Sequence, residues 1–163
     1  MINYDEFLNP TLVNVQPSGI RKFFAIAEEM QNVISLGVGE PDFLTPWHIR
    51  QAGIDNLAKG ATRYTANAGL TELREEISRY YARKFLVKYD PTDEILVTVG
   101  GSEGIDMAIR SIICPGDEVL VIEPSFVCYK PIIEVSGGKA VPLPTYQKDD
   151  FTLDPEVLKA AIT

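Results

Sequence analysis

Short apolar runs alternate with segments of helical periodicity in the second half of the chain. Glu94–Val99 and Val119–Ile122 are near-continuous apolar or β-branched runs, and Ala140–Leu143 is a weaker one. The residues between them, Ser102–Ile113 and Ser125–Val135, have the period of a helix. Strands that alternate with helices predict βαβ units and a mostly parallel sheet. Because the runs lack polar alternation, we expect an α/β fold whose strands are covered on both faces.

The first half of the chain is predicted to hold an N-terminal arm and three helices. Residues 1–17 are expected to form the arm. Apolar residues at helical spacing indicate helices over residues 20–30 and 70–85. Residues that favour helix ends bound the remaining helix, namely Thr45 as N-cap, Pro46 at the first position and Gly60 after the last turn.

The composition excludes several classes of partner. The 163 residues include 15 Lys and Arg against 23 Asp and Glu, which gives a net charge of −8. Nucleic acids and anionic membranes both favour basic surfaces, so neither is expected to bind. No window approaches the ~20 apolar residues of a membrane span. The acidic start of the chain lacks the features of a secretory signal, so a cytoplasmic protein is expected.

Cysteine and histidine residues predict no metal site. Cys114 and Cys128 lie in apolar segments, which predicts two buried free thiols rather than a disulfide or a metal pair. His48 is the single histidine, so a site with several histidines is excluded. A Ser-His-Asp triad would have to use His48.

A glycine turn, Gly100-Gly101, lies between a predicted strand and a predicted helix. Glycines let the backbone approach a ligand closely, and the N–H groups of a first helical turn favour a phosphate. Ser102 can add a hydroxyl donor. The turn lacks the Gly-Lys-Ser/Thr of a P-loop and the glycine spacing of a dinucleotide site, although Glu123 fits the latter. The alternative, that Ser102 merely caps the helix, stays open.

Three further features could face a ligand. Phe126 follows the next strand on the same rim of the sheet, where it could stack on a flat ring held at Ser102, and core packing is the alternative. Tyr64 lies in a polar segment between helices, and a loop tyrosine without a role is the alternative. The segment Gly37–Phe43 resembles a strand that leaves into a turn, and a Gly/Pro loop between domains is the alternative.

The order and spacing of these features resemble the N-terminal portion of class I/II aminotransferases of fold type I that use pyridoxal phosphate, in the aspartate and aromatic subgroup. The resemblance rests on Ser18–Arg21, Ile34–Phe43 with Thr45-Pro46, Tyr64 with Gly69 and Leu73-Arg74, Ile95–Glu103, Pro115–Val119, and Pro124–Phe126 with Tyr129. It implies a three-layer fold with a mostly parallel sheet. Residues 1–45 would form the N-terminal arm and part of the small domain, and residues 46–163 the first part of the large, cofactor-binding domain.

The resemblance also implies a site for pyridoxal 5'-phosphate. The backbone of Gly101, Ser102 and Glu103, with the Ser102 hydroxyl, would hold the cofactor phosphate. Phe126 would stack on the pyridine ring. Tyr64 would reach the phosphate of the neighbouring subunit, so a homodimer with shared active sites is expected.

The substrates implied by the resemblance are an amino acid and a 2-oxo acid, between which an amino group would move through an aldimine of the cofactor. Gly39 would contact the substrate carboxylate through its backbone, and Ile20 would close over the substrate. Two alternatives stay open. One is a carbon–sulfur lyase on the same scaffold, and the other is a non-catalytic βαβ module that binds a phosphate or nucleotide.

No catalytic residue is expected within these 163 residues. The family's Schiff-base lysine follows a serine, and none of the eight lysines of the chain does so. The lysine is therefore expected beyond Thr163, and the chain alone is expected to be inactive. The family's sheet also inserts later strands between the first strand and the next two. A truncated chain is therefore expected, with parts of its sheet uncovered.

Overall fold

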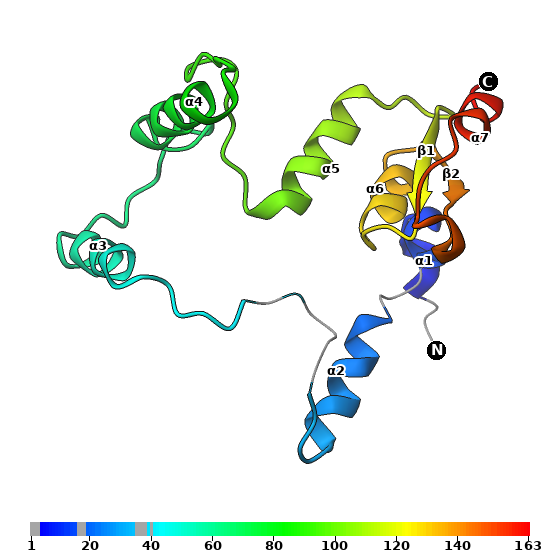
Figure 1. The fold of residues 1–163 in the computed structure, drawn as a ribbon, viewed down its shortest axis with the longest axis horizontal. Helices are drawn as coiled ribbons and strands as arrows, with labels where there is room; N and C mark the ends of the chain where they lie inside the picture. The colour runs from blue at the N-terminus through cyan, green and yellow to red at the C-terminus, as the bar shows by residue number, and fades with distance from the viewer. Residues whose placement is uncertain (1–3, 16–18, 35–38, 40) are drawn as a thin grey trace. The chain divides into compact units, whose positions relative to one another are not determined.

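The computed structural model describes residues 4–15, 19–34, 39 and 41–163, which divide into two units (Figure 1). The sheet unit comprises residues 1–19 and 99–163, and the helical unit comprises residues 20–98. The domain boundary expected at residue 45 stays a prediction.

A parallel pair of strands forms the centre of the sheet unit. Strand β1 (Glu118–Glu123) pairs with β2 (Lys139–Pro144), with Val121 opposite Pro142. Helix α6 (Tyr129–Val135) connects the two strands and contacts both of them (Figure 1). Val121 of β1, Leu143 of β2 and Ile133 of α6 are buried. The predicted βαβ unit and parallel pairing are therefore confirmed.

The other elements of the sheet unit are short or helical. They are η1 (Tyr4–Phe7), α1 (Pro10–Asn14), α5 (Gly100–Ile112), η2 (Gln147–Asp149) and α7 (Pro155–Ala160). The predicted arm therefore contains a helix, and α1 contacts α6. The Asn9 side chain caps α1 by accepting the Thr11 N–H at 2.9 Å. The Asp154 side chain caps α7 in the same way, from the Glu156 N–H at 2.9 Å.

Two expectations about the sheet are wrong. Residues 94–99 form no strand, and the described part of the chain has a sheet of two strands only. A strand needs a neighbouring strand to satisfy its backbone, whereas Val97 N–H donates to the Ala68 carbonyl in a turn, at 3.1 Å. The strands are also not covered on both faces, because Ile122 is 48% exposed. Helix α6 packs on one face of the sheet.

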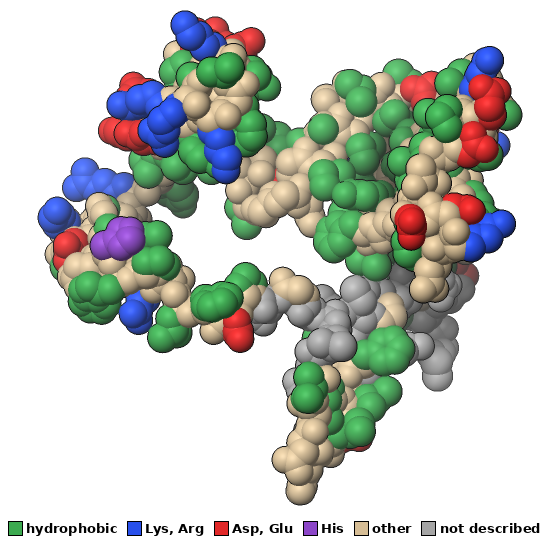
Figure 2. Space-filling view, viewed as in Figure 1, with side chains coloured by type: hydrophobic (Ala, Val, Ile, Leu, Met, Phe, Trp, Pro, Cys, Tyr) green, Lys and Arg blue, Asp and Glu red, His purple; other side chains and the backbone are tan. Residues whose placement is uncertain are grey.

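The helical unit contains α2 (Ile20–Glu29), α3 (Trp47–Ala58) and α4 (Thr71–Phe85), at the positions that the sequence predicts. Helix α3 begins one residue later than expected, because Pro46 rather than Thr45 is the N-cap. Gly60 ends it as predicted, in the left-handed region at φ +72°, with its N–H bound to the Leu57 carbonyl at 2.9 Å. Basic and acidic side chains cover much of α4 (Figure 2).

The cysteines are free thiols, as expected, but they are not buried. Cys114 is exposed because it lies in the turn between α5 and β1, where its N–H donates to Asp117 Oδ2 at 2.8 Å. Cys128 is half-buried just before α6. Across the described ranges, no three potential metal-binding side chains form a cluster, and no helix is long and apolar enough to span a membrane.

An ion pair joins the first residues of the two strands. Lys139 Nζ donates to Glu118 Oε1 at 2.6 Å, and the Thr163 hydroxyl donates to Glu118 Oε2 at 3.2 Å. The hydrogen bond from Lys139, followed by its charge and by the Thr163 bond, lowers the pKa of Glu118.

We expect Lys139→Met to raise the pKa of Glu118 toward its ordinary value of 4.5 in the full-length protein. The folded-state pKa is lowered, so the pair stabilises the fold above that ordinary value. The contribution is lost as the pH falls through the lowered pKa. A carbon-13 NMR titration of Glu118 measures the change. Lys130→Met is the control, because Lys130 pairs with Glu134 instead. An unchanged Glu118 pKa in Lys139→Met would contradict the assignment.

Ile133→Ala is expected to destabilise the full-length protein by about 2–5 kcal/mol, because it leaves a cavity at the most buried contact between α6 and the strands. Urea unfolding measures the loss. Lys130→Ala on the same helix is the control, since an exposed side chain should change stability by no more than about 0.5 kcal/mol. Similar losses for the two variants would show that Ile133 is not part of a packed core.

Candidate functional site

The glycine turn opens α5. Gly100 has φ +80°, a left-handed conformation that favours glycine, and Val99 is the N-cap. The N–H groups of Gly101 and Ser102 lie in the first turn, where an α-helix offers no acceptors of its own. A Cβ added to Gly101 would meet no atom of the described chain within 4 Å. The turn therefore presents donors at the positive end of a helix dipole, with space in front of them.

Ser102 is the third residue of this helix and not its cap. Val99 occupies the N-cap position, and no side chain caps the helix there. The alternative that Ser102 merely caps α5 is therefore wrong. Its hydroxyl belongs to the same turn as the N–H groups, where it can add a donor to an anion.

Glu103 has a different local role from its neighbours. Its carboxylate accepts a hydrogen bond from the Val99 N–H, so the side chain turns back to the start of the helix. A carboxylate is favourable at this end of the dipole. Any contact of Glu103 with a bound phosphate would therefore have to come from its backbone N–H, as the resemblance implies.

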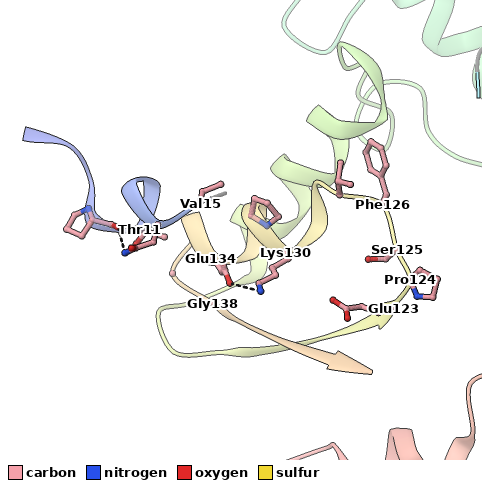
Figure 3. Close-up of a pocket in the computed structure, with 14 residues that line it drawn as sticks. Thr11, Val15, Glu123, Pro124, Ser125, Phe126, Lys130, Glu134 and Gly138 are labelled. Atoms are coloured by element: carbon pink, nitrogen blue, oxygen red, sulfur yellow. Dashed lines mark hydrogen bonds and ion pairs between the residues drawn. The ribbon is translucent and has the colours of Figure 1, made fainter. Parts of the chain in front are cut away.

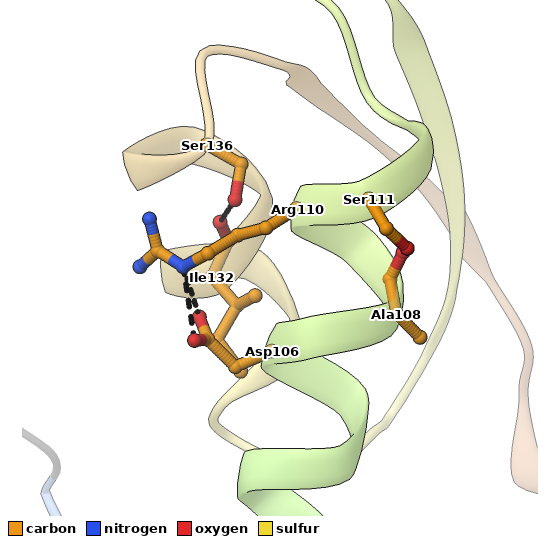
Figure 4. Close-up of polar contacts among 6 residues, drawn as sticks. All are labelled: Asp106, Ala108, Arg110, Ser111, Ile132 and Ser136. Carbon is orange, nitrogen blue, oxygen red and sulfur yellow. Dashed lines mark hydrogen bonds and ion pairs between the residues drawn. The ribbon is translucent and has the colours of Figure 1, made fainter. Parts of the chain in front are cut away.

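Contacts along α5 and α6 support the helices of this unit (Figure 4). On α5, Arg110 Nε donates to both oxygens of Asp106 at 2.9 Å, and this bond raises the pKa of Arg110. Arg110 lies in the last turn, where a cation is favourable. On α6, the Ser136 hydroxyl donates to the Ile132 carbonyl at 2.7 Å. Since the two helices contact each other, the glycine turn begins a helix that is anchored in the unit.

Phe126 lies in the loop between β1 and α6 and is 52% exposed. Its ring meets the edge of Tyr129, with centroids 5.9 Å apart and planes at 75°. The alternative that Phe126 belongs to the core is therefore wrong. An exposed aromatic ring at the carboxyl end of a parallel strand is placed where α/β sheets bind ligands.

A pocket of about 990 Å³ lies beside this loop (Figure 3). Glu123, Ser125 and Phe126 line it from the end of β1, and Lys130 and Glu134 line it from α6. Helix α1 closes another side. Lys130 lies 3.9 Å from Glu134, and the two carboxylates exceed the one ammonium group among these side chains. This balance does not favour a phosphate, and none of the described lining residues belongs to the glycine turn.

The remaining predicted site residues belong to the helical unit. Tyr64 is fully exposed in the loop between α3 and α4. Gly39 is exposed, and a Cβ added there would meet no described atom within 4 Å. Ile20 begins α2, and its side chain lies outside the described residues. Four neighbours of Gly39, at positions 36–38 and 40, also lie outside them. The structure thus brings Gly101, Ser102 and Glu103 together on one turn.

Sequence reasoning missed one residue of the helical unit. Arg74 is 7% exposed and is the buried residue of α4, although helical spacing of apolar residues predicts an apolar side chain at the buried position. A buried arginine needs acceptors from elsewhere in the chain, and periodicity within one helix gives no signal for these.

Comparison with known proteins gives one consistent result. The family of class I and II aminotransferases matches residues 31–163. A putative aminotransferase of Bacillus subtilis, YugH, is 48% identical over 96% of this chain and 41% of its own length. An aspartate aminotransferase of Pyrococcus abyssi is 44% identical over 91% of this chain and 38% of its own.

A solved structure agrees with these relatives. A crystal structure of a Pyrococcus protein, protein-A1, superposes with a TM-score of 0.88 at 43% identity, over 94% of this chain and 39% of that one. The chain therefore spans about two fifths of the length of the relatives it matches. Over that span it belongs to the class I and II aminotransferase family and has the fold type I architecture of its members.

Proposed function

We propose that the full-length protein transfers an amino group between an amino acid and a 2-oxo acid, with pyridoxal 5'-phosphate as cofactor. The observation that carries the proposal is the glycine turn at the start of α5, where the N–H groups of Gly101 and Ser102 lie in the first turn and a Cβ at Gly101 would meet open space. Membership of the aminotransferase family supports this reaction class over a plain phosphate-binding module.

The residues present fit this cofactor. A phosphate is a dianion near neutral pH, and a helix N-terminus with a serine hydroxyl suits it. Phe126 offers an exposed ring for the flat face of the pyridine. When bound, the cofactor supplies an electron-withdrawing ring and an aldehyde that takes up the substrate's amino group. The role of the described residues is to bind and orient that group.

Proton transfer and covalent attachment are assigned to a lysine outside residues 1–163, so these residues alone are inactive in this proposal. None of their eight lysines follows a serine. Tyr64 serves the cofactor phosphate of a second subunit, and its full exposure supports such a contact. The substrate carboxylate is bound by the Gly39 backbone, and Ile20 closes over the substrate. We place the protein in the cytoplasm as a homodimer.

Borohydride reduction tests the position of the nucleophile. In the full-length protein with pyridoxal 5'-phosphate, we expect the reduced cofactor to be attached to a lysine beyond Thr163, which peptide mass spectrometry identifies. A parallel assay with aspartate as amino donor and a 2-oxo acid as acceptor should yield a new amino acid. Attachment to any lysine within residues 1–163 would refute the assignment of the nucleophile.

Ser102→Ala is expected to weaken cofactor binding by about tenfold or more, because a hydrogen bond to a charged group contributes about 1.5–3 kcal/mol. Fluorescence titration of the full-length apoprotein measures the dissociation constant. Ser111→Ala on the same helix is the control, since that hydroxyl donates to the Ala108 carbonyl at 2.8 Å. Equal dissociation constants for Ser102→Ala and the unaltered protein would remove the phosphate contact from the proposal.

A further inference from the structure

Hydrogen bonds at three positions hold the segment 89–97 against α4 and the loop before it. The Ala68 carbonyl accepts the Val97 N–H at 3.1 Å. Arg74 binds the carbonyls of residues 91 and 92, and the Ser78 hydroxyl donates to the Tyr89 carbonyl at 2.5 Å. From residue 68 to residue 78 the numbers rise along α4 and the loop before it, while the bonded residues of the segment fall from 97 to 89. The segment therefore returns antiparallel to α4 in a fixed register.

Arg74 makes the central hydrogen bonds of this series. Its Nη1 donates to the Pro91 carbonyl at 2.6 Å and to the Thr92 carbonyl at 3.1 Å, and its Nη2 lies 3.3 Å from Thr71 Oγ1. A buried guanidinium without acceptors would be strongly unfavourable, so these carbonyls must stay in place. The fixed fork of an arginine can hold two carbonyls and a hydroxyl at once, which a lysine cannot do with the same geometry.

The loop that carries Tyr64 packs on the same segment. Gly69 has φ +95°, and its N–H donates to the Ala66 carbonyl at 2.8 Å. A Cβ at Gly69 would lie 2.7 Å from the Val97 side chain, so the loop touches the segment without room for another atom. Val97 is three residues before Gly100. The segment that Arg74 fixes therefore contacts the Tyr64 loop and leads into the glycine turn.

We propose that Arg74 is a positioning residue for the cofactor phosphate. It fixes the segment 91–97 against α4, and this segment in turn fixes the loop from Tyr64 to Gly69. Arg74 acts through Tyr64 and does not touch the cofactor. The inference rests on the proposed function, because it takes Tyr64 as a phosphate ligand. A purely structural Arg74 would change stability without any coupling to Tyr64.

A double-mutant cycle tests this proposal in the full-length protein. The dissociation constant of pyridoxal 5'-phosphate is measured for the unaltered protein, Arg74→Lys, Tyr64→Phe and the double variant. The temperature is one at which circular dichroism shows all four to be folded. We expect each single substitution to raise the constant by about tenfold, and the double variant to match Tyr64→Phe alone. Additive effects, or no effect of Arg74→Lys, would overturn the proposal.

Arg79→Lys is the matched control. Arg79 lies on the same helix, and its exposed side chain pairs with Glu75 and Glu76 at 3.3 Å. It should leave cofactor binding within twofold of the unaltered protein. The same tenfold loss in Arg79→Lys would overturn the proposal, because it would show that any change on α4 has this effect.

Gly69→Ala tests the same path if Arg74→Lys does not fold, since it displaces Val97. Its control is Gly60→Ala, which has a comparable positive φ but open space around the added Cβ. Coupling of Gly69→Ala to Tyr64→Phe, with none for Gly60→Ala, supports the proposal, and additivity overturns it.

If the unaltered protein binds no pyridoxal 5'-phosphate, the proposed function itself fails. If it binds the cofactor without coupling, only the role of Arg74 fails.

Discussion

The packing of α6 on the β1–β2 pair is the constraint on which the sheet unit depends. Ile133 of α6, Val121 of β1 and Leu143 of β2 are the buried apolar residues of the described chain. The parallel register leaves the end of β1 at Glu123, so the loop with Phe126 must start there. Because α5 packs on α6, the same small core also anchors the helix that begins at the glycine turn.

Local signals in the sequence predicted the elements whose structure is decided locally. The βαβ unit, the extent of α4 and the glycine that ends α3 were all found from periodicity and helix-end residues. Prediction failed where a distant partner decides the outcome. Residues 94–99 have strand composition but no neighbouring strand in the described regions. The buried Arg74 donates hydrogen bonds to carbonyls 17 and 18 residues away.

The candidate site shows the same division. The glycine turn and its donors follow from residues 100–103 alone, so the sequence was sufficient to predict a place for a phosphate. General burial tendencies favour the core for an aromatic residue, so the exposure of Phe126 followed only from its position on the rim after β1. Family membership connects these pieces to one chemistry.

The two-stranded sheet of the described residues has an unpaired outer edge at β1, which affects how these residues can associate. In the described regions each strand has one neighbour, so peptide groups along the outer edge of β1 can pair with any extended segment that approaches. Ile122 is 48% exposed, so β1 also presents apolar side-chain surface to solvent. An open strand edge is a template for pairing, so residues 1–163 on their own would be expected to associate through β1.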